Sequence, residues 1–270
     1  MLMEIGSRTD VGQMRGNNED CCKVVPELNL AVLSDGMGGE AHGEVASQMA
    51  VEGVANHCQE WVENLETPLA SEARADLSDH TNRLISAIRE TNRKIFETAK
   101  QNPTHRGMGA TVVAVWVNEQ RMSLAHVGDS RAYLLRSGEL QQLTADHSLV
   151  AEQVRRGIIT QQQADESENA SVLLRALGIE EDVQVDADEH LLMDGDIVLV
   201  CSDGLTRMVT EPEIASTLLT YPDAQSAADR LVELANEYGG ADNITVVLMR
   251  MPESPDGFLP RLWRWLMKPL

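Results

Sequence analysis

Two long stretches of the chain repeat apolar residues at the spacing of an amphipathic helix. The first runs from about Glu44 to Trp61, and the second runs from about Asn82 to Ala99. The polar residues 64–79 between them predict a connecting loop. Shorter helices are predicted from Ser148 to Arg156, after the capping box of Thr160 and Gln163, from Thr210 to about Leu219, and from about Ala224 to Tyr238.

Strands are predicted where the apolar runs are short or alternate with polar residues. Four such runs, separated by turn residues, predict an antiparallel meander at 111–117, 122–127, 132–135 and 139–143. Further strands are predicted at 21–25, 30–34, 197–201 and 243–251. The order of elements predicts an α+β domain in which helices pack on antiparallel sheets, with residues 147–171 as a helical flap.

The charge and cysteine content restrict the partners and the compartment. The chain has 43 acidic residues against 22 lysines and arginines, a formal net charge of −21, which opposes binding to nucleic acid or an anionic membrane. No apolar run reaches the ~18 residues that a membrane-spanning helix needs. Because no signal peptide precedes the cysteines and none form a Cys-x-x-Cys pair, we expect a reduced, cytoplasmic location.

Acidic residues recur where the predicted strands begin or end. Asp35-Gly36 and Asp203-Gly204 each follow a buried apolar strand, and Asp242 precedes the last strand. A single Asp-Gly pair after a strand is usually only a turn. Several acids delivered by separate elements, however, are what a dinuclear site for hard, oxygen-preferring cations requires. The recurrence therefore predicts a divalent metal centre.

Arg15 lies five residues before Asp20, beside another group of acids. Its guanidinium could be a salt-bridge partner of these acids. It could also bind phosphate oxygens bidentately, which the planar guanidinium does well. Both interpretations are compatible with this part of the sequence.

A series of short motifs runs through most of the chain, from about Gly6 to Met249. In order, the motifs are Arg15-x-x-Asn18-Glu19-Asp20, Asp35-Gly36-Met37-Gly38-Gly39, Gly109-Ala110-Thr111, Val127-Gly128-Asp129-Ser130-Arg131-Ala132-Tyr133, Leu143-Thr144-x-Asp146-His147-Ser148, Arg175-Ala-Leu-Gly178, Ser202-Asp203-Gly204-Leu205 and Asp242-Asn243. The series resembles that of the metal-dependent type 2C (PPM) serine/threonine protein phosphatases, and it is most similar to the compact bacterial members.

This resemblance implies a fold and a reaction. The fold is a four-layer αββα arrangement, a β-sandwich of two antiparallel sheets flanked by helix pairs. The reaction is hydrolysis of phosphoserine and phosphothreonine by direct attack of a hydroxide bridged between two Mn²⁺ or Mg²⁺ ions. Bacterial relatives often hold a third ion.

The resemblance also implies which residues bind the ions. Asp35 would bridge the two ions, and Gly36 would offer its backbone carbonyl. Asp203 and Asp242 would be the remaining direct ligands of the first ion. Asp129 and Asp203 match the ligands of the third ion.

Other positions match residues that act around the ions. Glu19 and Asp20 would hold water molecules on the ions, and Arg15 would bind the phosphate. Many eukaryotic members have a histidine, proposed as the general acid, where this chain has Met37. Methionine cannot donate a proton, and we assign no catalytic role to Met37 or to the nearby His42.

Two alternatives use the same residues differently. Residues 201–207 also match Cys-x-x-Gly-x-x-Arg, the phosphate loop of the cysteine-dependent phosphatases, with Cys201 as the nucleophile. In that loop Asp203 would repel the substrate, and we expect Cys201 to be a buried strand residue. A catalytically silent, phosphoprotein-binding pseudophosphatase would be expected to lack ligands, but all the matching acids are present.

The last part of the chain differs from the catalytic domain, which we place at residues 1–251. Residues 252–270 form a basic, apolar tail that could contact a membrane surface or a partner, or pack Leu262, Trp263 or Trp265 on the domain. We expect a monomer whose substrates are proteins that a serine/threonine kinase has phosphorylated. The flap at about 147–171 is the expected source of selectivity among these substrates.

Overall fold

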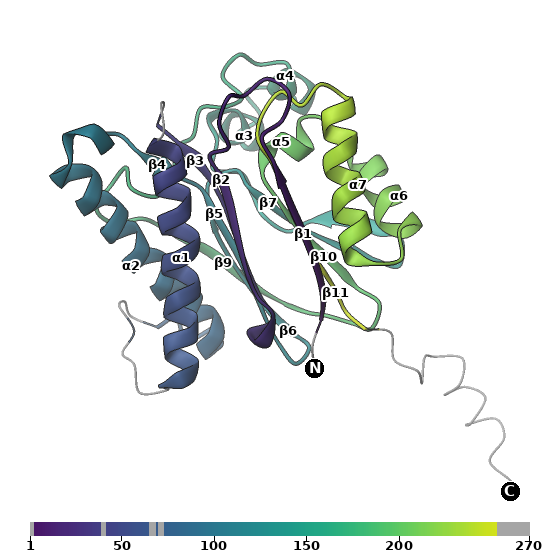
Figure 1. Cartoon of the computed structure of the whole chain (residues 1–270), viewed down its shortest axis with the longest axis horizontal. Coiled ribbons are helices and arrows are strands. Elements are labelled where there is room, and N and C mark those ends of the chain that lie inside the picture. Colours follow the sequence, from purple (N-terminus) through teal and green to yellow (C-terminus); the bar gives the residue numbers. More distant parts are fainter. Residues whose placement is uncertain (1–2, 39–41, 65–68, 70–72, 253–270) are drawn as a thin grey trace, which may run out of the picture.

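A computed structural model of the protein describes residues 3–38, 42–64, 69 and 73–252. Two antiparallel sheets lie face to face, and helices cover the outer face of each (Figure 1). This arrangement confirms the predicted α+β architecture of four layers.

Each sheet is assembled from strands that are distant in sequence. One sheet has the order β1–β11–β10–β7–β8, formed by β1 (Glu4–Asp10), β11 (Ile244–Arg250), β10 (Ile197–Cys201), β7 (Arg131–Arg136) and β8 (Glu139–Gln142). The other has the order β2–β3–β5–β6–β9, formed by β2 (Asp20–Val25), β3 (Leu30–Met37), β5 (Val112–Asn118), β6 (Arg121–Val127) and β9 (Asp186–Leu191), with the short β4 (Gly109–Ala110) pairing with the end of β3.

Central strands are apolar on both faces because each face is covered. In β5, Val113 and Val115 point into the core between the sheets, whereas Ala114 and Trp116 point to the helices on the outside. Strands covered on both faces appear in sequence as continuous apolar runs rather than as alternating ones. This explains the uninterrupted run Val112–Val117.

The helices match the predicted amphipathic segments closely. α1 (His42–Glu63) and α2 (Asp79–Gln101) cover the sheet that contains β5, and α6 (Glu211–Thr220) and α7 (Ala224–Glu237) cover the other sheet (Figure 1). α6 begins after its N-cap Thr210, as predicted, and a capping box of Thr210 and Glu213 opens it. Two 3-10 turns, Pro26–Leu28 and Pro103–His105, complete the connections.

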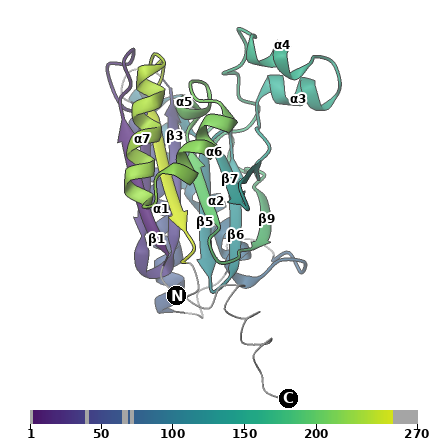
Figure 2. The ribbon, with the colours of Figure 1, turned by 90° about the vertical axis from the view of Figure 1, so that its right-hand side faces the viewer.

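The predicted flap is confirmed as a pair of short helices. Ser148 caps α3 (Leu149–Arg155), and the capping box of Thr160 and Gln163 opens α4 (Gln161–Asp165). Both helices project beyond one end of the sandwich (Figure 2). The same end carries α5 (Asp203–Thr206), which follows β10 directly (Figure 1).

Three details differ from the sequence prediction. The predicted meander is wrong because β6 and β7 lie in different sheets, so the chain crosses between the sheets at Gly128. Asp35 lies inside β3, which continues through Gly36 to Met37 because β4 provides a hydrogen-bonding partner. The strand β1 was missed, because this edge strand is half polar and shows no apolar run.

Some predictions concern residues outside the described ranges. They include much of the loop at 64–79, Gly39, Glu40, and the tail from residue 253 onward. Among the described helices, none combines the length and the apolar character needed to cross a membrane.

Candidate metal centre

The pairing of β2 with β3 brings two carboxylates together. Asp20 lies directly opposite Asp35 in the antiparallel register, and opposed residues of such a pair point to the same face of the sheet. The N–H of Gly36 donates to the Glu19 carbonyl at 3.1 Å, which extends the ladder past Asp20. The backbone of Glu19, Asp20 and Asp35 is therefore fixed by one strand pair.

The other sheet delivers two more acids to the same end of the sandwich. β10 pairs antiparallel with β11, so the end of β10 lies beside the start of β11. Asp203 opens α5 immediately after β10, and Asp242 lies just before β11. The Oδ1 atom of Asp242 accepts a hydrogen bond from the Asn243 N–H at 2.9 Å, and the Asn243 Oδ1 atom accepts one from the Glu19 N–H at 2.8 Å.

Ser202 links the two sheets at this point. Its side chain is fully buried, and its hydroxyl donates to Oδ2 of Asp20 at 2.7 Å. The hydroxyl oxygen of Ser202 in turn accepts a hydrogen bond from the N–H of Thr245 in β11 at 3.0 Å. Sequence reasoning gave Ser202 no role, and its position beside Asp203 in the motif was the only signal.

Asp129 reaches this end from the turn between β6 and β7. Gly128 has φ of +108°, and a Cβ atom there would lie 2.6 Å from the Thr111 side chain. Only glycine fits this turn, because it tolerates positive φ and has no Cβ. The turn leaves Asp129 buried, with 8% of its surface exposed.

The acids lie close enough to perturb one another. Burial, followed by the charges of Asp20, Asp203, Asp129 and Asp242, raises the pKa of Asp35 well above its ordinary value. Burial likewise raises the pKa of Asp20 and the pKa of Asp129 to about 7. Such a cluster stays ionised only if cations neutralise it.

Arg15 lies beside the acids, as both interpretations of the sequence require. Its Nη2 atom lies 2.8 Å from Oδ2 of Asp242, and 52% of its side chain is exposed. One side of the guanidinium is therefore held by the protein, while a large part of the side chain is open to solvent.

The donor set fits divalent cations. Oδ1 of Asp20 and Oδ1 of Asp203 are buried and have no hydrogen-bond partner among the described residues. A buried carboxylate oxygen without a partner is costly, and a hard cation with oxygen ligands removes that cost. The residues present thus fit the metal centre that the sequence predicted.

Comparison with known proteins gives the family. The family model described as protein phosphatase 2C matches residues 15–248. The chain belongs to the protein phosphatase 2C family. The serine/threonine phosphatase stp of Listeria welshimeri is 39% identical to it over 245 residues, which cover 90% of this chain and 93% of the relative.

Solved structures agree with the sequence relatives. The crystal structure of the Mycobacterium tuberculosis serine/threonine phosphatase PstP/Ppp superposes with a TM-score of 0.81 at 36% identity, covering 94% of this chain and all of that chain (100%). The catalytic domain of PstP in complex with two manganese ions superposes with a TM-score of 0.78 at 35% identity, covering 93% and 99%. This protein is therefore a metal-dependent phosphoprotein serine/threonine phosphatase.

The structure of this phosphatase argues against the cysteine-based alternative. Cys201 is fully buried in β10, and burial raises the pKa of its thiol to about 12. A nucleophilic cysteine must be an accessible thiolate near neutral pH. As predicted, Cys201 is a buried strand residue.

His147 and Arg175, to which sequence reasoning assigned no role, hold the base of the flap in this phosphatase. The Nδ1 atom of His147 accepts the N–H of Gly128, and its own backbone N–H donates to the Gly128 carbonyl, both at 3.0 Å. Arg175, at the other end of the flap, donates to Asp186 at 2.7 Å. The flap is thereby tied to the turn that carries Asp129.

The same group of residues has the composition of a second metal site. Ligand atoms of His126, His147 and Asp186 lie within 4.8 Å of one another. The guanidinium of Arg175 already neutralises Asp186, and burial, then His126 and Arg175, lower the pKa of His147 to about 4. We therefore interpret this group as a structural anchor that contains its own cation.

Proposed function

We propose that the acids at this end of the sandwich bind two divalent ions and that the chain uses them to hydrolyse phosphoserine and phosphothreonine in proteins. The observation that carries the proposal is the convergence of mutually repelling acids from both sheets, two of which have a buried oxygen with no hydrogen-bond partner in the described part of the chain. The manganese-bound PstP structure, which superposes over almost the whole chain, supports manganese as an occupant.

The proposed metal ligands are the residues that the family resemblance implies, in the positions that the structure gives them. Asp35 would bridge the ions, the Gly36 carbonyl would contribute a neutral ligand, and Asp203 and Asp242 would complete the first ion's direct protein ligands. Asp129 matches a ligand of the third ion that bacterial relatives often hold. A Cβ atom at Gly36 would lie 2.1 Å from the Gly43 carbonyl oxygen, so α1 packs directly against this part of β3.

The groups around the ions would handle water and phosphate. Divalent ions supply positive charge that activates water and neutralises the phosphoryl oxygens. Glu19 and Asp20 would hold water molecules on the ions, and Ser202 would keep Asp20 in place. Arg15, positioned by Asp242, would bind the phosphate with its remaining donors.

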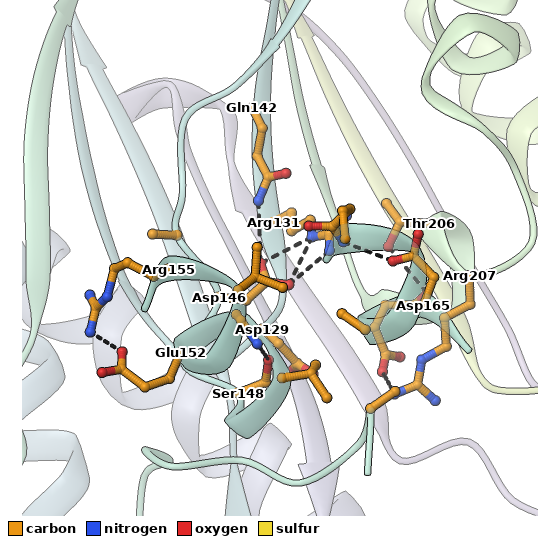
Figure 3. Close-up of a pocket in the computed structure, with 18 of the residues that line it drawn as sticks. Asp129, Arg131, Gln142, Asp146, Ser148, Glu152, Arg155, Asp165, Thr206 and Arg207 are labelled. Carbon is orange, nitrogen blue, oxygen red and sulfur yellow. Dashed lines mark hydrogen bonds and ion pairs between the residues drawn. The ribbon is translucent and has the colours of Figure 1, made fainter. Parts of the chain in front are cut away.

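A pocket beside these acids is the proposed contact region for the phosphoprotein. It has a volume of about 1050 Å³ and is lined by Asp129 and Arg207 together with flap residues such as Ser148 and Glu152 (Figure 3). We propose that the flap selects among substrates of a serine/threonine kinase. We also retain the catalytic domain at residues 1–251, a monomeric state and a cytoplasmic location as proposals.

The decisive experiment is hydrolysis of a phosphothreonine peptide by the metal-stripped chain with and without added Mn²⁺. Activity should require the ion, and Asp203→Asn should abolish it because a direct ligand is lost. Cys201→Ser is the matched variant two residues away and should retain most of the activity. Loss of activity in Cys201→Ser with retention in Asp203→Asn would refute the assignment, and inactivity of the folded wild type with Mn²⁺ would favour a pseudophosphatase.

A further inference from the structure

Arg207 lies at the metal centre, although none of the proposed metal-binding or catalytic roles includes it. It follows the single turn of α5, four residues after Asp203, and its N–H donates to the Asp203 carbonyl at 2.9 Å. Its Nη2 atom lies 2.5 Å from Oδ2 of Asp203, and its Nη1 atom lies 3.7 Å from Oδ2 of Asp242. The short helix therefore directs a fixed positive charge onto two of the proposed ligands.

The two oxygens of Asp203 have different surroundings. Oδ2 is paired with the guanidinium of Arg207, whereas Oδ1 is buried without a hydrogen-bond partner among the described residues. One oxygen is thus left for an ion, while the other already has a cation.

Arg207 and Asp129 come from different parts of the chain but face the same cavity. Arg207, Asp129 and Asp203 line the same pocket, and Figure 3 shows the first two at its wall. The guanidinium therefore contacts Asp203, one of the two carboxylates that the third ion of bacterial relatives would share, and lines the same pocket as the other, Asp129.

We propose that Arg207 replaces the third ion in this phosphatase as an internal cation between Asp129 and Asp203. An arginine stays protonated at all accessible pH values, so the positive charge that it places in the site does not depend on pH. A third divalent ion must displace the guanidinium from Asp203 or bind beside it against charge repulsion. The chain consequently binds two ions tightly and the third only weakly. This inference rests on the proposed ligand roles of Asp129 and Asp203.

The test is a Mn²⁺ titration of the full-length, metal-stripped chain by isothermal calorimetry, with the number of bound ions checked by the paramagnetic resonance of free Mn²⁺. Arg207→Gln removes the charge and keeps much of the side-chain length. We expect it to bind the third Mn²⁺ about tenfold more tightly than the wild type, a difference of about 1.4 kcal/mol, because the ion pair that competes for Asp203 is gone. Arg207→Lys keeps the charge and should retain a weak third site.

Two further variants control for indirect effects. Arg230→Gln removes an arginine that pairs with Glu237 within α7 and with none of the proposed metal ligands. Its Mn²⁺ titration should match that of the wild type. Adding Asp129→Asn to Arg207→Gln should abolish the gain, because the new ion needs that carboxylate.

The outcomes separate this inference from the proposed function. Identical titrations of Arg207→Gln and the wild type would overturn the inference alone, as would a gain that survives Asp129→Asn or that also appears in Arg207→Lys. Absence of any tight Mn²⁺ site in the folded wild type, with no change in Asp35→Asn, would overturn the dinuclear assignment and the inference with it.

Discussion

Replacing Ser202 by alanine tests how the two sheets are joined at the metal centre. The substitution removes the donor to Oδ2 of Asp20 and the acceptor for the Thr245 N–H. The carboxylate of Asp20 and the N–H of Thr245 both lie in the interior and each lose a hydrogen bond. Oδ1 of Asp20 already has no partner among the described residues. Each buried polar group left unpaired costs about 1–3 kcal/mol, so the two groups together should lower the free energy of unfolding of Ser202→Ala by about 2–6 kcal/mol.

The assay is urea unfolding of the metal-stripped protein, followed by far-ultraviolet circular dichroism, so that metal binding does not hide the loss. Ser34→Ala is the matched control. Ser34 is equally buried, but its hydroxyl donates at 2.6 Å to a neutral backbone carbonyl of Thr111 within the same sheet. Its loss leaves one buried acceptor unpaired instead of two groups, so it should cost about 1–3 kcal/mol, roughly half the loss in Ser202→Ala.

Equal losses in Ser202→Ala and Ser34→Ala would refute this account of the link between the sheets. A loss below about 0.5 kcal/mol in Ser202→Ala, the range of ordinary surface substitutions, would refute it as well. In either case Asp20 would have to be held by contacts other than Ser202.

Three further substitutions test single features of the structure. Gly36→Ala should lower the melting temperature in a thermal scan, because its Cβ atom would collide with backbone at Gly43, and forced overpacking costs about 1–3 kcal/mol or more. Glu189→Gln should flatten the dependence of urea stability on pH. Burial alone would raise the pKa of Glu189, but hydrogen bonds from Ser78, Thr81 and Arg121 outweigh burial and lower the pKa to about 2. The ionised Glu189 therefore stabilises the fold fully above the ordinary glutamate pKa of about 4.3, and this stabilisation disappears as the pH falls through about 2. Arg15→Ala should reduce kcat/KM for a phosphopeptide on the order of 100-fold, because it removes a donor to phosphate.

Each of these substitutions has a matched control in the chain. Gly16→Ala adds a Cβ atom where nothing lies within 4 Å, and it should leave the melting temperature unchanged. Glu233→Gln changes an exposed acid of α7 and should keep the wild-type pH curve, and Arg8→Ala should keep wild-type kinetics. Equal melting temperatures for the two glycine variants, parallel pH curves for Glu189→Gln and the wild type, or wild-type kinetics in Arg15→Ala would contradict the respective predictions.

Much of the local structure was predictable because its causes are local. The apolar spacing of α1 and α2 and the capping boxes at Thr160 and Thr210 act within a few residues, and the structure confirms each of them. The positions of the acids around the predicted strands also indicated the chemistry, because hard cations need several carboxylates from separate elements.

Predictions failed where the cause was a distant partner. Asp35 lies within β3 rather than after it because β4, from a remote part of the chain, extends the pairing. β6 and β7 look like neighbours of one meander but pair in different sheets. The half-polar β1 is a strand because β11 offers it a complete ladder.

The sequence by itself determined which residues are helical, which acids are available and which family motifs they form. Only the tertiary structure decided that Ser202 bridges Asp20 to the opposite sheet and that Arg207 neutralises one oxygen of Asp203. The physical reason is that hydrogen bonds and ion pairs depend on distances between atoms, and residues as far apart in the chain as Asp20 and Ser202 come within 2.7 Å only when the two sheets pack together.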